Sequence, residues 1–278
     1  MAISPQMGDE ARVATAEQPV AQGTRAAANR RIRVPWRLFA WYGASVVLLV
    51  AVWQALGHAF GIVFVPFSTT IVNFWTLVRT GVMGSALLTS GKVFGAGLGL
   101  CLVIGVVLGL LLARVRLLSA AIEPYVYLLY AMPTITLVPF VFAAFGFGFW
   151  PQVLITVLIA IFPVVIGVAE GARSIPQELL DVAASYRTSE PQLWRHVIVP
   201  YVVPHAMSGV KQTIALTLVG TLVAEFFLNA TGVAALLVYA SNNVKPAELL
   251  SVTLMISILA IVLVGIGEAI QRYFTKWL

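Results

Sequence analysis

Residues 173–204 read RSIPQELLDVAASYRTSEPQLWRHVIVPYVVP and form a polar interval between two long apolar segments. Within this interval, residues 174–177 and 189–192 share the order serine, any residue, proline, glutamine. A serine can cap the N-terminus of a helix, proline is tolerated in the first turn, and glutamine three residues after the serine completes a capping box. The interval therefore predicts two short helices, at residues 175–186 and 190–199, that meet at residues 186–188.

The first of these expected helices has only a small apolar stripe. Four side chains fall on roughly one face of it: Leu179, Leu180, Ala183 and Ala184. A helix this short is marginal without tertiary packing. We therefore expect the pair of helices to dock on a partner surface.

The composition of the whole chain places this interval in a membrane protein. Of the 278 residues, 60% are hydrophobic and 10% are charged, whereas charged residues make up about 25% of a soluble domain. We expect an all-α, polytopic membrane domain at residues 35–278, preceded by a polar, disordered cytoplasmic tail at residues 1–34. The first apolar run is too long for a cleaved signal peptide. The single cysteine, Cys101, excludes an intrachain disulfide and a cysteine-based metal site.

Six apolar runs are long enough to cross a hydrocarbon core of about 30 Å as helices of roughly 20 residues. These runs lie at residues 38–57, 86–113, 120–145, 151–170, 207–228 and 248–271. Pro133 and Pro139 each remove a backbone hydrogen bond from the third run, so we expect a kink or a break there. Glu123 and Pro124 suit the first turn of that helix.

Glycines in the second run predict close packing against another helix. Small residues spaced four apart share one helix face and let two backbones approach. They are Gly91, Gly95 and Gly99, followed by Gly105 and Gly109. Between the first two runs, residues 69–79 predict a short amphipathic helix at the membrane surface.

Lysine and arginine residues are distributed unevenly between the loops. If the N-terminus is cytoplasmic, 14 of the 17 lie on the cytoplasmic side or its interface. Arg79 and Lys245 lie on the other side, and Lys92 lies within the second run. Because positive charge marks cytoplasmic loops, we expect both termini and residues 174–200 in the cytoplasm. The same asymmetry explains the net charge of +6 without a nucleic-acid partner.

The sequence contains no complete motif for nucleotide binding or catalysis. The nearest match to a P-loop, Ser90-Gly91-Lys92-Val93, lacks the earlier glycine and the final hydroxyl. The three histidines, His58, His196 and His205, are far apart in the expected topology. We therefore expect no catalytic residues, no metal site and no cofactor in this chain, and an intramembrane enzyme is not favoured.

Residues 173–204 also resemble the cytoplasmic coupling loop of ABC-importer permeases, whose pattern is E-A-A, three residues, glycine, and later I-x-L-P. Residues 181–183 (Asp-Val-Ala) stand for E-A-A, and residues 197–200 stand for the closing motif. Arg187 occupies the position of the motif glycine. Pro133, Pro139 and the pair Phe145-Gly146 match a second family segment. The resemblance runs from about residue 85 to 268, and the nitrate/sulfonate/taurine permeases are the most similar subfamily.

This resemblance implies the type I ABC-importer permease fold with six transmembrane helices. It implies separate ATPase subunits that bind ATP and Mg, a second permease subunit in a homodimer or heterodimer, and an extracytoplasmic solute-binding protein. The chain would lie in the bacterial cytoplasmic (inner) membrane, in contact with lipid, and would not itself be an enzyme. The residues expected to couple it to the ATPase are Glu178, Asp181, Ala183, Ala184, Arg187 and Pro200.

The resemblance also implies a path for a small solute, with the anion classes sulfonate, nitrate and aromatic carboxylate as candidates. The residues expected in the path or its gate are Lys92, Pro133, Pro139 and Glu225. For Lys92 the alternatives are an inward-facing ammonium group and an interfacial anchor. For Glu225 they are an outer gate, a substrate contact and a structural helix contact.

Two other functions remain open from the sequence. An ion-coupled secondary transporter would hold its ion site in broken helices and often show internal repeats. A membrane scaffold without transport activity is the other, because Arg187 departs from the family pattern.

Arginine is strained where the family has glycine. We therefore expect a reshaped turn, with the guanidinium either paired to an ATPase carboxylate or solvated.

Overall fold

The computed structural model describes residues 36–61, 64–228 and 231–274, and the expected tail at residues 1–34 lies outside them. The chain divides into two compact units, residues 1–50 and 51–278. Helix α1 (Trp36–Ala59) begins in the first unit and ends in the second. The architecture below is that of residues 51–278, which holds all the other helices.

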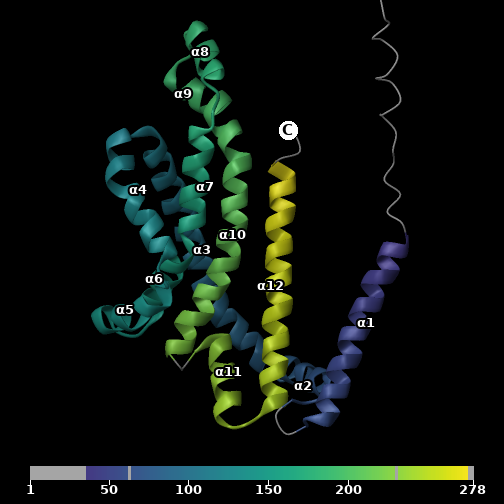
Figure 1. Cartoon of the computed structure of the whole chain (residues 1–278). Coiled ribbons are helices and arrows are strands. Elements are labelled where there is room, and N and C mark those ends of the chain that lie inside the picture. The colour runs from purple at the N-terminus through teal and green to yellow at the C-terminus, as the bar shows by residue number, and fades with distance from the viewer. Residues whose placement is uncertain (1–35, 62–63, 229–230, 275–278) are drawn as a thin grey trace, which may run out of the picture. The chain divides into compact units, whose positions relative to one another are not determined.

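The described part of the chain contains helices and no strand, in agreement with the all-α prediction (Figure 1). After α1 the elements are α2 (Phe67–Arg79), α3 (Val82–Arg114), α4 (Arg116–Ala131), the 3-10 helix η1 (Thr134–Leu137), α5 (Val138–Phe145), α6 (Phe149–Ala160), α7 (Phe162–Arg173), α8 (Gln177–Ser185), α9 (Glu190–Leu193), the π-helical turn η2 (Trp194–Ile198), α10 (Val199–Leu228), α11 (Gly232–Asn242) and α12 (Pro246–Phe274).

Four straight helical stretches in the described residues are long and apolar enough to cross a membrane, or six if each of two bent helix pairs is one span. The straight ones are Trp41–Ala59, Val82–Arg114, Glu190–Phe227 and Pro246–Phe274. The bent pairs join α4 to η1 and α5, and α6 to α7. All six correspond to the apolar runs of the sequence, and α2 matches the expected amphipathic helix.

The two bends follow from proline. Helix α4 ends at Ala131, and the chain turns by 94° around Pro133 before η1 and α5. Pro139 does not break a helix, because it lies in the first turn of α5, where its missing N–H has no partner to lose. The bend between α6 and α7 is 43° and lies just before Pro163. The sequence analysis did not anticipate this second bend.

Two other expectations about helix ends were wrong. Helix α4 begins at Arg116, so Glu123 and Pro124 lie in its interior and not in its first turn. The helix expected at residues 190–199 is only the start of a continuous 38-residue stretch, Glu190–Phe227. It runs through α9, the π-helical turn and α10 with no break that would separate it from the fifth span.

The glycines of α3 pack as predicted at one set of positions and not at the other. A Cβ at Gly109 would lie 2.7 Å from the carbonyl oxygen of Val165 on α7, and one at Gly105 would overlap Val164. In contrast, a Cβ at Gly91, Gly95 or Gly99 would meet nothing within 4 Å among residues 36–61, 64–228 and 231–274. The close-packed face of α3 is therefore the one that carries Gly97, Cys101, Gly105 and Gly109, spaced four residues apart.

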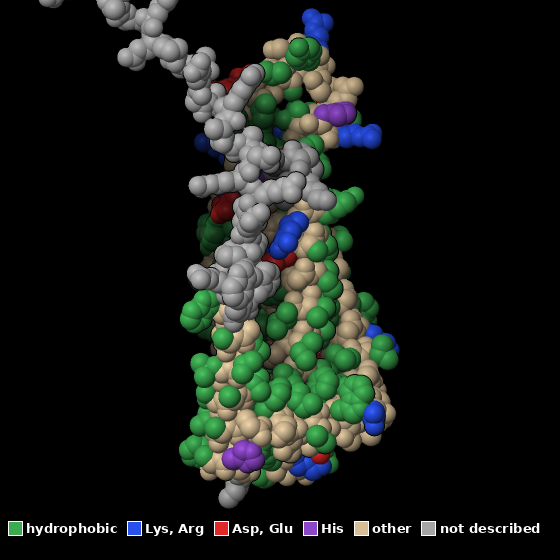
Figure 2. All heavy atoms as spheres, turned by 90° about the vertical axis from the view of Figure 1, so that its right-hand side faces the viewer, with side chains coloured by type: hydrophobic (Ala, Val, Ile, Leu, Met, Phe, Trp, Pro, Cys, Tyr) green, Lys and Arg blue, Asp and Glu red, His purple; other side chains and the backbone are tan. Residues whose placement is uncertain are grey.

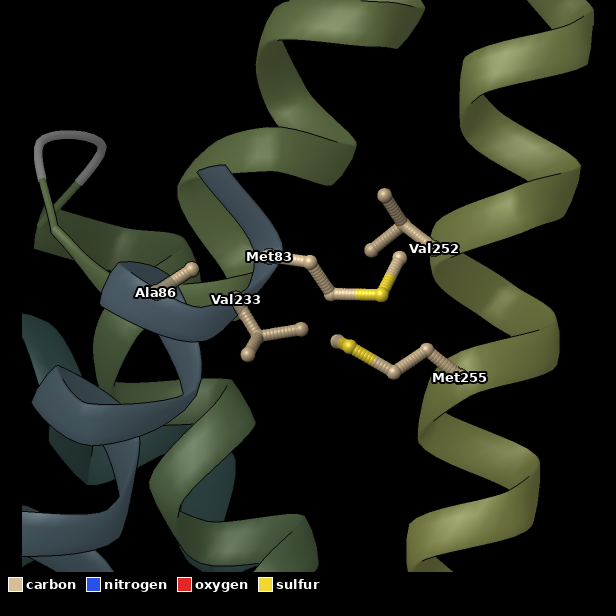
Figure 3. Close-up of a cluster of buried hydrophobic side chains, with 5 residues drawn as sticks. All are labelled: Met83, Ala86, Val233, Val252 and Met255. Atoms are coloured by element: carbon tan, nitrogen blue, oxygen red, sulfur yellow. The ribbon is translucent and has the colours of Figure 1, made fainter. Parts of the chain in front are cut away.

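Apolar side chains fill the contacts between these helices and also cover their outer surfaces. Figure 3 shows one buried cluster, in which Met83 and Ala86 of α3, Val233 of α11, and Val252 and Met255 of α12 point toward one another. On the outside, Val103 is 66% exposed and Ile261 is 72% exposed. Hydrophobic side chains cover much of the face drawn in Figure 2. An exposed surface of this kind is what a lipid environment requires.

Candidate functional site

Helix α8, in the segment that the sequence singled out, lies between the bent pair α6–α7 and the membrane-crossing stretch Glu190–Phe227, and α9 is the start of that stretch. Helices α8 and α9 extend beyond the ends of α7 and α10, at the opposite end of α10 from α11 (Figure 1). Arg114, at the C-terminal end of α3, holds this segment from below. Its guanidinium lies 3.4 Å from the carboxylate of Glu190 and 5.1 Å from the ring centroid of Trp194. An ion pair and a cation–π contact together therefore position α9.

One of the two predicted capping boxes is present. The side chain of Ser189 caps α9, and the backbone N–H of Ser189 donates to Oε1 of Gln192 at 3.1 Å. The other prediction was wrong: Ser174 Oγ donates to the carbonyl of Gly171 at 3.0 Å instead. Pro176 is the residue before α8, so the helix begins two residues too late for Ser174 to cap it.

Arg187 keeps the turn that glycine usually makes, contrary to the expected reshaping. Its φ is +50°, in the left-handed region. The N–H of Thr188 bonds to the carbonyl of Ala183 at 3.1 Å, and the N–H of Arg187 bonds to that of Ala184 at 2.9 Å. These two bonds are the Schellman motif that ends a helix. Arg187 therefore adopts the left-handed conformation of such a turn itself and bears its steric cost.

The outward apolar face of α8 differs from the predicted stripe. Leu179, Val182 and Tyr186 are 43%, 54% and 82% exposed. Ala183 is buried against the rest of the chain at 7% exposure, and Leu180 is half-buried. The face available to a partner is thus built from residues spaced three and four apart, rotated from the expected one. Among the other expected coupling residues, those exposed are Glu178, Asp181, Ala184 and Arg187, and Pro200 is half-buried.

The residues expected in the path do not gather in one place. Pro133 and Pro139 lie at the bend between α4 and α5, and Lys92 is exposed on α3, where a Cβ at the neighbouring Gly91 would meet no described atom within 4 Å. Lys245, near the end of α11, lies 2.9 Å from Glu248, and this hydrogen-bonded ion pair raises the pKa of Lys245. Within the described ranges no three His, Cys, Asp or Glu side chains lie close enough to hold a metal ion.

Glu225 is completely buried and caps α11. Its Oε2 accepts a hydrogen bond from the backbone N–H of Ala234 at 3.2 Å, and Ser90 Oγ accepts one from the N–H of Val233 at 2.9 Å. Gly232 has a φ of +76°, and a Cβ there would overlap the carboxylate. A carboxylate at the positive end of a helix is favourable. This geometry supports the helix-contact alternative for Glu225.

A set of polar, accessible side chains that the sequence analysis did not single out as a site lies on α4, α7 and α10. We call it the polar face, and it consists of Tyr127, Tyr130, Glu170, His205, Ser208 and Gln212. All six side chains are exposed, and Gln212 Nε2 donates to Tyr130 Oη at 3.1 Å. The signal was present in the sequence: residues 201, 205, 208 and 212 are polar and follow a helical spacing within an apolar helix.

Comparisons with known proteins give the family. Residues 105–278 match the model of the family described as "binding-protein-dependent transport system inner membrane component". The riboflavin transport system permease protein RibX of Chloroflexus aurantiacus is 28% identical over 59% of this chain, and the match covers 62% of RibX. A putative aliphatic sulfonates transport permease protein, SsuC of Bacillus subtilis, is 25% identical over 83% of this chain and 84% of its own length.

A solved structure has the same fold. The MetNI methionine ABC transporter, in inward-facing conformations, contains a chain that superposes with a TM-score of 0.60 at 18% sequence identity. The match covers 72% of this chain and 97% of that chain. The six-span, all-α architecture is therefore the type I permease fold that the sequence predicted.

Proposed function

Because this chain belongs to the family of binding-protein-dependent transport system inner membrane components, we propose that it is the membrane-spanning subunit of an ATP-driven importer of a small solute. ATP and Mg bind to separate ATPase subunits, and a solute-binding protein delivers the solute from outside the cytoplasmic membrane. The chain performs no chemistry itself. It alternates access between the two membrane faces as the ATPases close and open.

The outward face of α8 supports a docking role. Leu179, Val182 and Tyr186 form an apolar surface outside the membrane-spanning helices, where lipid does not cover it. Exposed apolar groups of this kind at a helix surface are typical of protein interaction sites. Helix α8 is held by its Schellman turn and by the anchored α9, so it presents these side chains in a fixed orientation. We infer that they insert into a groove of the ATPase.

A second permease subunit completes the path in this proposal. Helix α4 has no buried side chain in this chain. Aromatic and aliphatic groups on α4 and α5 are widely exposed, for example Leu128 at 62% and Phe140 at 72%. A second copy or a related chain would cover part of this surface, and either arrangement encloses a path that one chain cannot.

A small anion is the solute class that we propose, with a sulfonate as the leading candidate. The similarity to SsuC over most of both chains supports it. The charges at the end of the chain that holds α11 agree: the cations Arg79, Lys92 and Lys245 outnumber the carboxylates of Glu248 and the buried Glu225. A net positive entrance raises the local concentration of anions. The ion pair with Glu248 reduces the contribution of Lys245, so Arg79 and Lys92 carry most of this effect.

The docking role is tested by placing a charge on the outward face of α8. Val182→Arg should weaken binding of the ATPase subunit to the detergent-solubilised permease by tenfold or more, because it buries a charge in an apolar contact. Asn242→Arg is the matched control, since Asn242 is exposed at the far end of α11. Equal ATPase affinity for Val182→Arg, Asn242→Arg and the unaltered chain, measured by titration, would contradict the docking role.

A further inference from the structure

The polar face is unusual because it lies on membrane-spanning helices and is open. Glu170 lies on α7 three residues before that helix ends, and Ser208 and Gln212 lie well inside the stretch Glu190–Phe227. A carboxylate or an amide exposed to lipid is costly, and such groups normally face protein or water. The exposure of these side chains in a single chain therefore indicates a water-filled space beside α4, α7 and α10.

A cleft of about 190 Å³ lies within the polar face. Its polar lining comes from Tyr130, Glu170, Ser208 and Gln212. Helices α7 and α10 approach closely at the base of the cleft, where a Cβ added to Gly167 would lie 3.4 Å from the Cα of Gly209. The two glycines leave the base of the cleft without side chains, so a small molecule can reach the hydrogen-bonding groups around it.

The charge of the cleft is negative. Glu170 is the one Asp, Glu, Lys or Arg side chain in its lining, and no salt bridge joins Glu170 to a basic group among the described residues. The nearby Glu123, in contrast, is neutralised by Arg173, because both of its carboxylate oxygens accept hydrogen bonds from that guanidinium at 2.7 Å. Lys211, on α10, is paired with Glu268 of α12. Arg173 also attracts Glu170 electrostatically, but its hydrogen bonds to a carboxylate go to Glu123, and the ion pair of Lys211 is with Glu268.

We propose that this cleft is a binding site in the translocation path, and that Glu170, with Tyr130, Ser208 and Gln212, binds a cationic or hydrogen-bond-donating group of the transported solute. The carboxylate accepts from an ammonium or a similar donor, the tyrosine ring stabilises positive charge, and the hydroxyl and amide groups complete the hydrogen bonding.

This inference rests on the proposed function and narrows its substrate. A simple anion such as nitrate offers the cleft no donor and is repelled by Glu170. A solute that carries an amine as well as an acidic group satisfies both the positive entrance near α11 and the negative cleft. The site therefore favours a zwitterionic solute, for example an aminosulfonate, over a bare inorganic anion.

Thiol chemistry in the assembled importer tests the site without knowledge of the solute. Cys101 is buried at 0% exposure, so the unaltered chain is the blank. Ser208→Cys adds one nearly isosteric thiol to the cleft. We expect it to react with cationic trimethylammonium and with anionic sulfonate methanethiosulfonate reagents, with the cationic reagent favoured relative to a free thiol. Adding Glu170→Gln should lower this preference on the order of tenfold, since one charge acts oppositely on the two reagents.

Glu178→Gln, on the exposed surface of α8 and outside the lining of the cleft, is the control and should leave the preference unchanged. Failure of both reagents to modify Ser208→Cys would show that no water reaches the cleft and would overturn the proposal. An unchanged preference in the Glu170→Gln background would overturn the assigned charge role. Neither result depends on ATP-driven uptake, so the importer assignment can stand or fall separately in the transport assay.

Discussion

At the scale of single residues, Arg187 shows that a left-handed turn at the end of a helix can form without the glycine that usually occupies it. The two hydrogen bonds of the Schellman turn and a φ of +50° are those of a helix that normally ends at glycine. The left-handed conformation costs an L-residue roughly 1–2 kcal/mol. The sequence alone identified the conflict between an arginine side chain and a left-handed turn at this position, but it predicted that the turn would change its shape. The structure shows that the side chain is accommodated instead.

Replacing Arg187 by glycine should therefore stabilise the end of α8. We expect Arg187→Gly to raise the free energy of unfolding by up to about 1 kcal/mol, because relief of the left-handed strain exceeds the added freedom of the unfolded chain. Thermal unfolding of the solubilised chain measures it. Arg187→Ala is the control, since it removes the charge and keeps the strain. A gain of the same size in both variants would show that charge, and not backbone strain, limits stability here.

Pairing of the Arg187 guanidinium with an ATPase carboxylate stays a prediction, and so does the role of Lys92. For Lys92, however, the structure removes one reason to expect an ammonium group that faces inward. Close packing at Gly91 and Gly95 was the reason to expect the ammonium group to face away from lipid, but a Cβ at either glycine would meet no atom of the described residues within 4 Å. A second permease subunit, or water in the solute path, would then have to contact the ammonium group of Lys92 in place of a helix of this chain.

At the scale of elements, the sequence predicted helices well and their interruptions less well. Apolar length identified all six spans, and Pro133 marked a real break. Proline alone does not predict a break, because Pro139 and Pro163 both lie in the first turn of a helix, where proline is tolerated. Pro163 still marks a bend, since α6 ends just before the helix that Pro163 helps to start. The sequence analysis did not predict the continuous stretch from Glu190 to Phe227. Its first residues are polar and follow a capping box, so they were interpreted as a separate short helix.

The packed face of α3 gives a prediction with a matched control. Gly109→Ala should lower the free energy of unfolding by about 1–3 kcal/mol, because the new methyl group overlaps the backbone of α7. Gly99→Ala lies in the same helix with open space around it, so it should be neutral or stabilising by up to about 1 kcal/mol. Thermal unfolding in one detergent compares them. Equal effects of the two substitutions would contradict the assigned face of α3.

At the scale of the whole molecule, the sequence could predict class and fold more readily than the site. Apolar runs and the coupling-loop pattern are local, so they are readable in order along the chain. The polar face joins α4, α7 and α10, which are separated in sequence, and only packing brings Tyr130 to Gln212 or Glu123 to Arg173. The orientation of the termini stays a prediction that rests on the distribution of lysine and arginine.

The central claim, that this chain forms the path of an ATP-driven importer, is tested most directly by uptake into proteoliposomes. The chain would be reconstituted with its ATPase subunits and solute-binding protein, and accumulation of a radiolabelled aminosulfonate would be followed with ATP, without ATP, and with an imposed proton or sodium gradient alone. We predict accumulation that requires ATP and the binding protein and is abolished by Val182→Arg. Accumulation driven by an ion gradient in the absence of ATP would contradict the account and favour a secondary transporter.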